Sequence, residues 1–266
     1  MSGLENIRLQ QAYQEVSYYR AVQLFNDGNY DKAVVHFDKA LVYKHNKTYE
    51  ALAYYWKAES QYRSEQFENS IASYQHFQNS PLARTMPEFQ SASYHIAYAY
   101  FKLWKFAKSL KAFEVFVGNT KEKDMRLHDA YVRMGDSHCM LKAYTGAIAD
   151  YEKAVELWGL DADYAAYQIA LAYQQMEKYD KVVERLLDFG VQFSNSTYRD
   201  DALYRMGEAY IKLGESDKAI AMFKKIESVF PSSAYLADAK MKVGLVLYNS
   251  ERYSESINQF KAIVSD

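Results

Sequence analysis

Histidine and cysteine are among the residues that could act as nucleophiles, bases or soft metal ligands. The chain has one cysteine, Cys139. Its six histidines are scattered among different segments and are His36, His45, His76, His95, His128 and His138. No two histidines have the spacing of a metal-ligand pair, and the neighbours His138 and Cys139 would point in different directions on a helix. The sequence also lacks a glycine-rich phosphate loop and a nucleophile elbow. We therefore predict no catalytic residue, no cofactor and no metal site, in a protein that is not an enzyme.

The charge balance and hydropathy argue against two classes of partner. The 32 basic and 34 acidic side chains leave a net charge of −2, so no positive excess points to nucleic-acid binding. No apolar run approaches the roughly eighteen residues that a membrane span requires, and we expect no direct membrane insertion. Only three prolines and ten glycines accompany 26 tyrosines and 14 phenylalanines, which favours long helices joined by short turns. The expected fold class is all-α.

One aromatic-anchored phrase occurs seven times, at intervals of 35 to 39 residues. The copies are NYDKAVVHFDKAL (29–41), QFENSIASYQHFQ (66–78), KFAKSLKAFEVFV (105–117), AYTGAIADYEKAV (143–155), KYDKVVERLLDFG (178–190), ESDKAIAMFKKIE (215–227) and RYSESINQFKAIV (252–264). Each follows a stretch of helical pattern that has a small residue at a matching place, such as Gly207. Each also has a smaller residue four positions before a large one, as in Ala219 and Phe223. Residues four apart share a helix face, so the pattern predicts closely packed helix pairs.

The repeating unit resembles the tetratricopeptide repeat (TPR), a helix–turn–helix of about 34 residues. The resemblance is best in the sixth unit, where these residues fall at the family's packing positions: Leu203, Met206, Gly207, Tyr210, Ala219, Phe223 and Pro231. It implies a right-handed α-solenoid of about seven repeats, forming a single domain over residues 1–266. The expected boundaries are a helical extension at 4–13 and repeats at about 14–47, 51–84, 90–123, 128–161, 163–196, 200–233 and 237–266. We also expect a fragment of a longer protein, because the last apolar-faced helix is followed by no capping helix.

In a stacked array of this kind the first helix of each repeat lines the inner face, which makes its aromatic residues candidates for binding. Tyrosine occupies the family's groove-facing fifth position in five of the seven repeats. The predicted partner-binding groove comprises Tyr55, Trp56, Tyr62, Tyr94, Tyr98, Phe101, Arg133, Tyr167, Tyr204 and Arg205. Tyrosine also packs well against an adjoining helix, so packing alone is an equally good explanation for the tyrosine row. The aromatic cluster in the second and third repeats favours binding.

A narrower resemblance rests on ESVFPSSAYLADAKMKVGLVLYNSERYSESINQFKAI (227–263), where a Phe-Pro-Ser-Ser joint leads into Ala-Asp-Ala. This joint is similar to the bacterial envelope branch of the family, which includes the TolA-binding protein and the repeat lipoprotein of outer-membrane barrel assembly. The resemblance implies a periplasmic or envelope-associated assembly factor, and a cytoplasmic location stays open. No repeat carries the lysine and asparagine pair with which chaperone-binding members hold a terminal carboxylate.

The predicted function is a non-catalytic scaffold that binds a peptide or protein segment in a tyrosine-rich concave groove. Two alternatives stay open. One is a sensor whose curvature changes when it binds a peptide or small ligand, and the other is a structural spacer whose groove is filled by its own extensions or a second copy. The identity of the partner and the oligomeric state are open as well.

Overall fold

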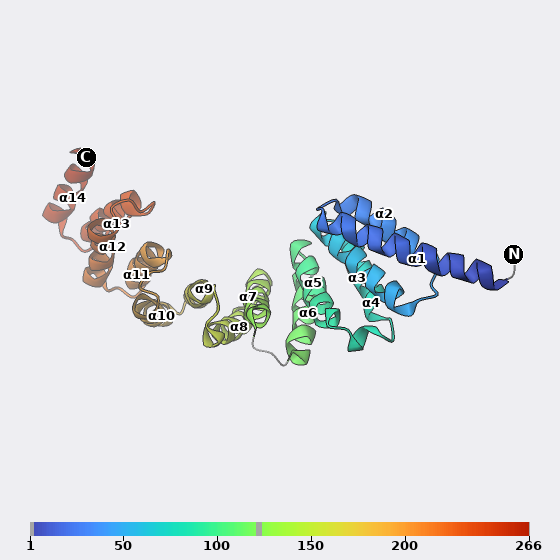
Figure 1. Cartoon of the computed structure of the whole chain (residues 1–266). Helices are drawn as coiled ribbons and strands as arrows, with labels where there is room; N and C mark the ends of the chain where they lie inside the picture. The colour runs from blue at the N-terminus through green and yellow to red at the C-terminus, as the bar shows by residue number, and fades with distance from the viewer. Residues whose placement is uncertain (1–2, 121–123, 266) are drawn as a thin grey trace. The chain divides into compact units, whose positions relative to one another are not determined.

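The computed structural model describes residues 3–120 and 124–265, and these form fourteen α-helices and one short 3₁₀ helix, with no β-strand. Figure 1 shows the helices following one another along the chain as antiparallel pairs. The prediction of an all-α fold is confirmed. Within the described residues, no helix is both long enough and apolar enough to cross a membrane.

The chain divides into two compact units, Met1–Ser137 and His138–Asp266, and the division falls inside α7. The helices of the first unit are α1 (Gly3–Asn26), α2 (Tyr30–Ala40), α3 (Lys47–Arg63), α4 (Phe67–Gln78), η1 (Ala83–Thr85), α5 (Glu88–Lys102), α6 (Phe106–Asn119) and most of α7 (Met125–Met140). The second unit contains α8 (Tyr144–Leu157), α9 (Ala162–Gln175), α10 (Tyr179–Gln192), α11 (Arg199–Lys212), α12 (Ser216–Val229), α13 (Leu236–Asn249) and α14 (Tyr253–Ser265). The single domain over residues 1–266 stays a prediction.

Every helical pair is joined by a tight turn with one residue in the left-handed region. These residues are Gly28, Glu65, Trp104, Lys142, Glu177, Gly214 and Glu251, with φ between 56° and 76°. The amide after each one donates to a carbonyl five residues back, for example Gln66 N–H to Gln61 O at 2.8 Å. This bond closes a Schellman-type cap and satisfies a carbonyl at the end of the first helix. Only two of the seven residues are glycine, so the cap geometry recurs without a glycine signature.

Within a pair, a small residue on the first helix receives a large ring from the second. A Cβ atom added to Gly207 would lie 2.6 Å from the Phe223 ring, and one added to Gly244 would lie 2.5 Å from the Phe260 ring. In the third pair the corresponding residues, Ala97 and Phe113, are both fully buried. The small residues of the second helices also approach closely, since Ser109 Oγ donates to Ala97 O at 3.0 Å. This packing is the small-and-large pattern of the sequence seen in three dimensions.

Candidate functional site

The first unit carries a row of half-buried rings on its first helices. Trp56 of α3 contacts Phe25 of α1, with ring centroids 5.1 Å apart. On α5, Tyr94 contacts Tyr98 at 5.5 Å, and Tyr98 contacts Phe101 at 6.2 Å. Trp56, Tyr94, Tyr98 and Phe101, together with Tyr62 of α3, each keep part of their surface exposed. We call Trp56, Tyr62, Tyr94, Tyr98 and Phe101 the aromatic surface.

Tyr62 of α3 contacts α5 through His95. Its ring stacks on the His95 imidazole with centroids 5.4 Å apart and planes 23° apart, and His95 also contacts Tyr94 at 5.5 Å. Burial raises the pKa of Tyr62 to about 12, so the phenol is neutral and can donate a hydrogen bond at physiological pH.

A buried carboxylate lies beneath this stack. Glu59 of α3, with only 6% of its side chain exposed, lies 2.5 Å from His95 Nδ1 and also accepts a hydrogen bond from the Tyr74 hydroxyl. Burial alone would raise the pKa of Glu59, but its interactions with His95 and Tyr74 lower the pKa below its usual value. The three residues come from α3, α4 and α5, so they tie three helices together under the ring of Tyr62.

Arg133 of α7 adds a cation to the aromatic surface. Its guanidinium carbon lies 6.0 Å from the centroid of Tyr98 and 5.9 Å from that of Phe101, within the range of a cation–π interaction. Two acidic groups orient it, since Arg133 Nη1 donates to Asp136 at 2.6 Å and Nε donates to Asp129 at 3.3 Å. Burial would lower the pKa of Arg133, but the nearby Tyr98, Asp136 and Asp129 raise it, and the cation is maintained.

Asp129 also links two successive repeats. The Tyr94 hydroxyl donates to Asp129 Oδ2 at 2.5 Å, and burial together with this carboxylate raises the pKa of Tyr94. The second unit repeats the link. Tyr167 donates to Asp201 at 2.5 Å, and Tyr204 donates to Asp238. A tyrosine on one first helix is thus held by an aspartate at the start of the next.

The second unit buries the tyrosines that correspond to Tyr94. Tyr167 and Tyr204 are 3% and 7% exposed. Each is covered by a tyrosine from the following joint, because Tyr198 stacks on Tyr167 at 5.2 Å and Tyr235 stacks on Tyr204 at 4.9 Å. Arg205, which corresponds to Arg133, bonds to Asp201 at 3.2 Å and to Glu208 at 3.4 Å.

The structure therefore separates the predicted groove residues into two groups. Tyr55, Tyr167 and Tyr204 are buried, whereas the other seven keep partial exposure: Trp56, Tyr62, Tyr94, Tyr98, Phe101, Arg133 and Arg205. The ring and cation–π contacts described above connect six of these seven to neighbouring aromatic residues in the first unit: Trp56, Tyr62, Tyr94, Tyr98, Phe101 and Arg133.

Two features of this region were not predicted from the sequence. The first is the set of Tyr–Asp bonds, whose partners are 34 or 35 residues apart. A signal for them exists, because DAYVRMGD (129–136) and DALYRMGE (201–208) share an aspartate, an arginine four residues later and an acid three residues after that. The second is the Glu59–His95 pair, which has no equivalent repeated pattern.

Metal-ion chemistry finds no support in the described part of the chain, where no group of three or more histidine, cysteine, aspartate or glutamate side chains could hold an ion. His138 is paired instead with Asp150, with 2.7 Å between Nδ1 and Oδ2. The absence of enzymatic activity stays a prediction.

The sixth helical pair matches a known family of helical repeats. Residues 201–233, which contain the Gly207–Phe223 packing contact, match the family model described as tetratricopeptide repeat. This segment is similar to a TPR. A comparison with curated proteins found no match for the chain.

Solved structures of TPR proteins match nearly the whole chain. The C-terminal part of a TPR-containing protein from Cytophaga hutchinsonii has a TM-score of 0.69 and 16% identity, covering 93% of this chain and 94% of that one. A TPR protein from Parabacteroides merdae has a TM-score of 0.57 and 15% identity, covering 96% of this chain and 93% of that one. YrrB, described as a TPR protein with an unusual peptide-binding site, has a TM-score of 0.58 and 20% identity, covering 77% and 97%. At these identities the likeness establishes the TPR fold alone.

Proposed function

We propose that this TPR chain is a non-catalytic scaffold whose aromatic surface, together with Arg133, binds a peptide or a protein segment. One observation carries the proposal: five rings on α3 and α5 keep exposed area although each already packs on a neighbouring helix, and Tyr94, Tyr98 and Phe101 contact one another in series. Rings that are partly exposed and held rigid offer a large contact area at a low cost in conformational entropy. The peptide-binding site named for YrrB gives the proposal a precedent in a protein of the same fold.

The contacts around Arg133 suggest how a bound segment would be oriented. Its guanidinium is held by two carboxylates and lies over two rings, so it is already ordered before a partner arrives. A backbone carbonyl of the partner could accept a hydrogen bond at the edge of this group, while apolar side chains cover Tyr98 and Phe101. The buried Tyr55, Tyr167 and Tyr204 would support the surface by holding adjacent repeats together.

Photo-crosslinking tests the assignment at single residues. A benzoylphenylalanine placed at Tyr98 should crosslink a partner in an extract of the native cells. The same group placed at Trp158, a ring 62% exposed in the second unit, should not crosslink that partner. Tyr98→Ala with Phe101→Ala should weaken binding of the crosslinked partner by roughly tenfold or more if these rings are central contacts. Equal labelling at both positions, or unchanged binding by a folded double variant, would refute the proposal.

The location that we propose is the bacterial envelope, supported by the FPSS joint followed by Ala-Asp-Ala. Cell fractionation with an antibody against the native protein tests this directly. Recovery of the protein in the periplasmic or membrane fraction is the expected result, and recovery only with cytoplasmic markers would contradict it.

A further inference from the structure

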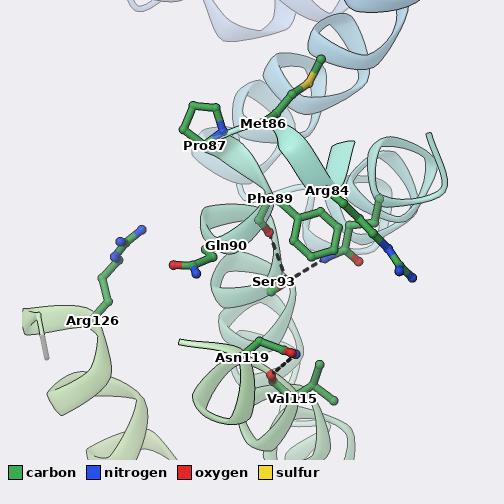
Figure 2. A pocket seen from close by; sticks show the side chains of 10 residues that line it. Arg84, Met86, Pro87, Phe89, Gln90, Ser93, Val115, Asn119 and Arg126 are labelled. Atoms are coloured by element: carbon green, nitrogen blue, oxygen red, sulfur yellow. Dashed lines mark hydrogen bonds between the residues drawn. The ribbon is translucent and has the colours of Figure 1, made fainter. Parts of the chain in front are cut away.

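A second surface lies on α5, between α4 and α6, and includes none of the rings of the aromatic surface. It consists of two cavities of about 860 and 300 Å³ that share Gln78, Ser93 and Val115 as lining residues. Figure 2 shows the larger cavity, with Phe89, Gln90 and Ser93 on α5 and with Val115 and Asn119 on α6. We call the two cavities together the α4–α6 groove.

The joint before α5 explains why the groove exists at this place. Residues 79–87 separate α4 from α5, whereas only residues 158–161 separate α8 from α9. The longer joint contains two of the three prolines of the chain and forms η1, whose Arg84 lines the groove together with Met86 and Pro87. Pro87 ends the joint immediately before α5, and Phe89 in the first turn of the helix adds an apolar wall.

The charged residues that line the groove are all basic, although the chain as a whole is slightly acidic. They are Arg84, Lys108, Lys111 and Arg126, and no carboxylate of the described residues lines either cavity. Arg126 is neutralised by Asp124, at 2.8 Å. Among the described residues, Arg84, Lys108 and Lys111 have no carboxylate partner, and Lys108 lies over the Tyr100 ring at 5.8 Å. Three cations therefore line a groove in which residues 3–120 and 124–265 place no carboxylate.

The equivalent cavity of the second unit is lined by carboxylates as well as by basic residues. A cavity of about 510 Å³ lies there over α9, between α8 and α10, and Ile169 lines it as Ile96 lines the α4–α6 groove. Glu152 and Asp188 stand where the α4–α6 groove has Gln75 and Val115. Arg185 of α10 bonds to Glu152 of α8 at 2.5 Å, so an ion pair of the chain itself spans this cavity.

We propose that the α4–α6 groove binds an acidic peptide segment that also carries apolar side chains. The lysines and Arg84 would pair with its carboxylates, because charge complementarity directs a partner to an unneutralised surface. Phe89, Ile96 and the 53% exposed Val115 would receive its apolar side chains. The amides of Gln75, Gln78 and Gln90 can both donate to and accept from a peptide backbone. A nucleic acid fits less well, since its phosphate backbone would leave the apolar wall uncovered.

A display library of random dodecapeptides, selected on the full chain, tests the proposal. Selection should enrich peptides that combine aspartate or glutamate with leucine, isoleucine or phenylalanine. A synthetic peptide of the enriched sequence should bind the wild-type chain, and its affinity should fall as salt is raised, because exposed charges are screened. Lys108→Glu with Lys111→Glu should weaken this binding by roughly tenfold or more, since each change replaces an attraction with a repulsion.

Two further variants separate the groove from general effects of charge. Lys181→Glu alters the residue of α10 that corresponds to Lys108 and should leave binding unchanged. Gln75→Glu with Ala112→Arg would install in the α4–α6 groove the ion pair found between α8 and α10, and should block binding. Enrichment of basic or uncharged peptides, equal binding by the folded Lys108→Glu/Lys111→Glu variant, or tighter binding of a labelled twelve-nucleotide single strand than of the peptide would overturn the proposal. The selection is repeated on the full chain carrying Tyr98→Ala and Phe101→Ala, which excludes peptides held by the aromatic surface, so the two proposals fail independently.

Discussion

Replacing Glu59 by glutamine tests the buried cluster that supports the aromatic surface. The glutamate accepts from Tyr74 and pairs with His95, and a hydrogen bond to a charged group contributes about 1.5–3 kcal/mol. The glutamine oxygen can still accept one neutral hydrogen bond, so the variant loses about one charge-assisted bond, or about 2 kcal/mol. The side chain is only 6% exposed, which leaves little screening by water.

The destabilisation caused by Glu59→Gln should depend on pH. The pKa of Glu59 is lower in the folded chain than its usual value, so its contribution to stability is fully present above the unfolded pKa of about 4.3. It is lost as the pH falls through the lower folded pKa. The difference in unfolding free energy between the wild type and Glu59→Gln should therefore be about 2 kcal/mol at about pH 7.5 and narrow below about pH 4.5.

Urea unfolding followed by circular dichroism and by tryptophan fluorescence measures this difference at each pH. Glu68→Gln is the matched control, because Glu68 lies on the neighbouring helix α4 and forms an exposed pair with Lys105 at 3.1 Å. It should change the unfolding midpoint little. A Glu59→Gln chain as stable as the wild type at neutral pH, or a gap that does not narrow in acid, would refute the proposed role of the carboxylate.

Three further changes test the packing of the repeats. Gly207→Ala should destabilise the chain by about 1–3 kcal/mol in urea unfolding, because the new Cβ would lie 2.6 Å from the Phe223 ring. Gly190→Ala is the control and should not destabilise the chain, because its new Cβ would meet no heavy atom within 4 Å. Tyr167→Phe should cost about 1 kcal/mol by the same measurement, since its bond to Asp201 is lost while Asp201 keeps Arg205. An unchanged midpoint would show that the Tyr–Asp link does not hold the repeats together. Glu65→Gly should raise the melting temperature because φ is +58° there, and Glu65→Ala should not; equal effects of the two would argue against strain at this turn.

The helical pairs could be predicted from the sequence because their determinants are local. Each unit has a small residue on its first helix, a turn, and a second helix in which a large residue follows a smaller one by four positions. This pattern recurs every 35 to 39 residues, and helix geometry brings its members together within one pair. The turns show the limit of this argument. Glu65, Trp104 and Glu251 adopt the left-handed conformation that glycine would have marked, because the packed pair and the Schellman bond hold them there.

The candidate site could be predicted only in part. The sequence grouped Tyr55, Tyr94, Tyr167 and Tyr204 as one row, since they share a position in the repeat. Their exposure depends on what the next repeat places over them, and Tyr198 covers Tyr167 while no such tyrosine precedes α7 to cover Tyr94. The repeat pattern therefore does not predict which tyrosines are exposed, because their exposure depends on the residues of the joints.

The sequence by itself determined that this chain is a series of TPR-like helical pairs, because burial of a periodic apolar face requires nothing beyond neighbours in the chain. Only the tertiary structure decided which rings stay exposed, that Glu59 meets His95, and that three cations share the α4–α6 groove. These features join residues that lie on different helices, and Glu59 and His95, for example, are 36 positions apart. Their contacts depend on the length and path of each joint, which the repeat pattern does not specify.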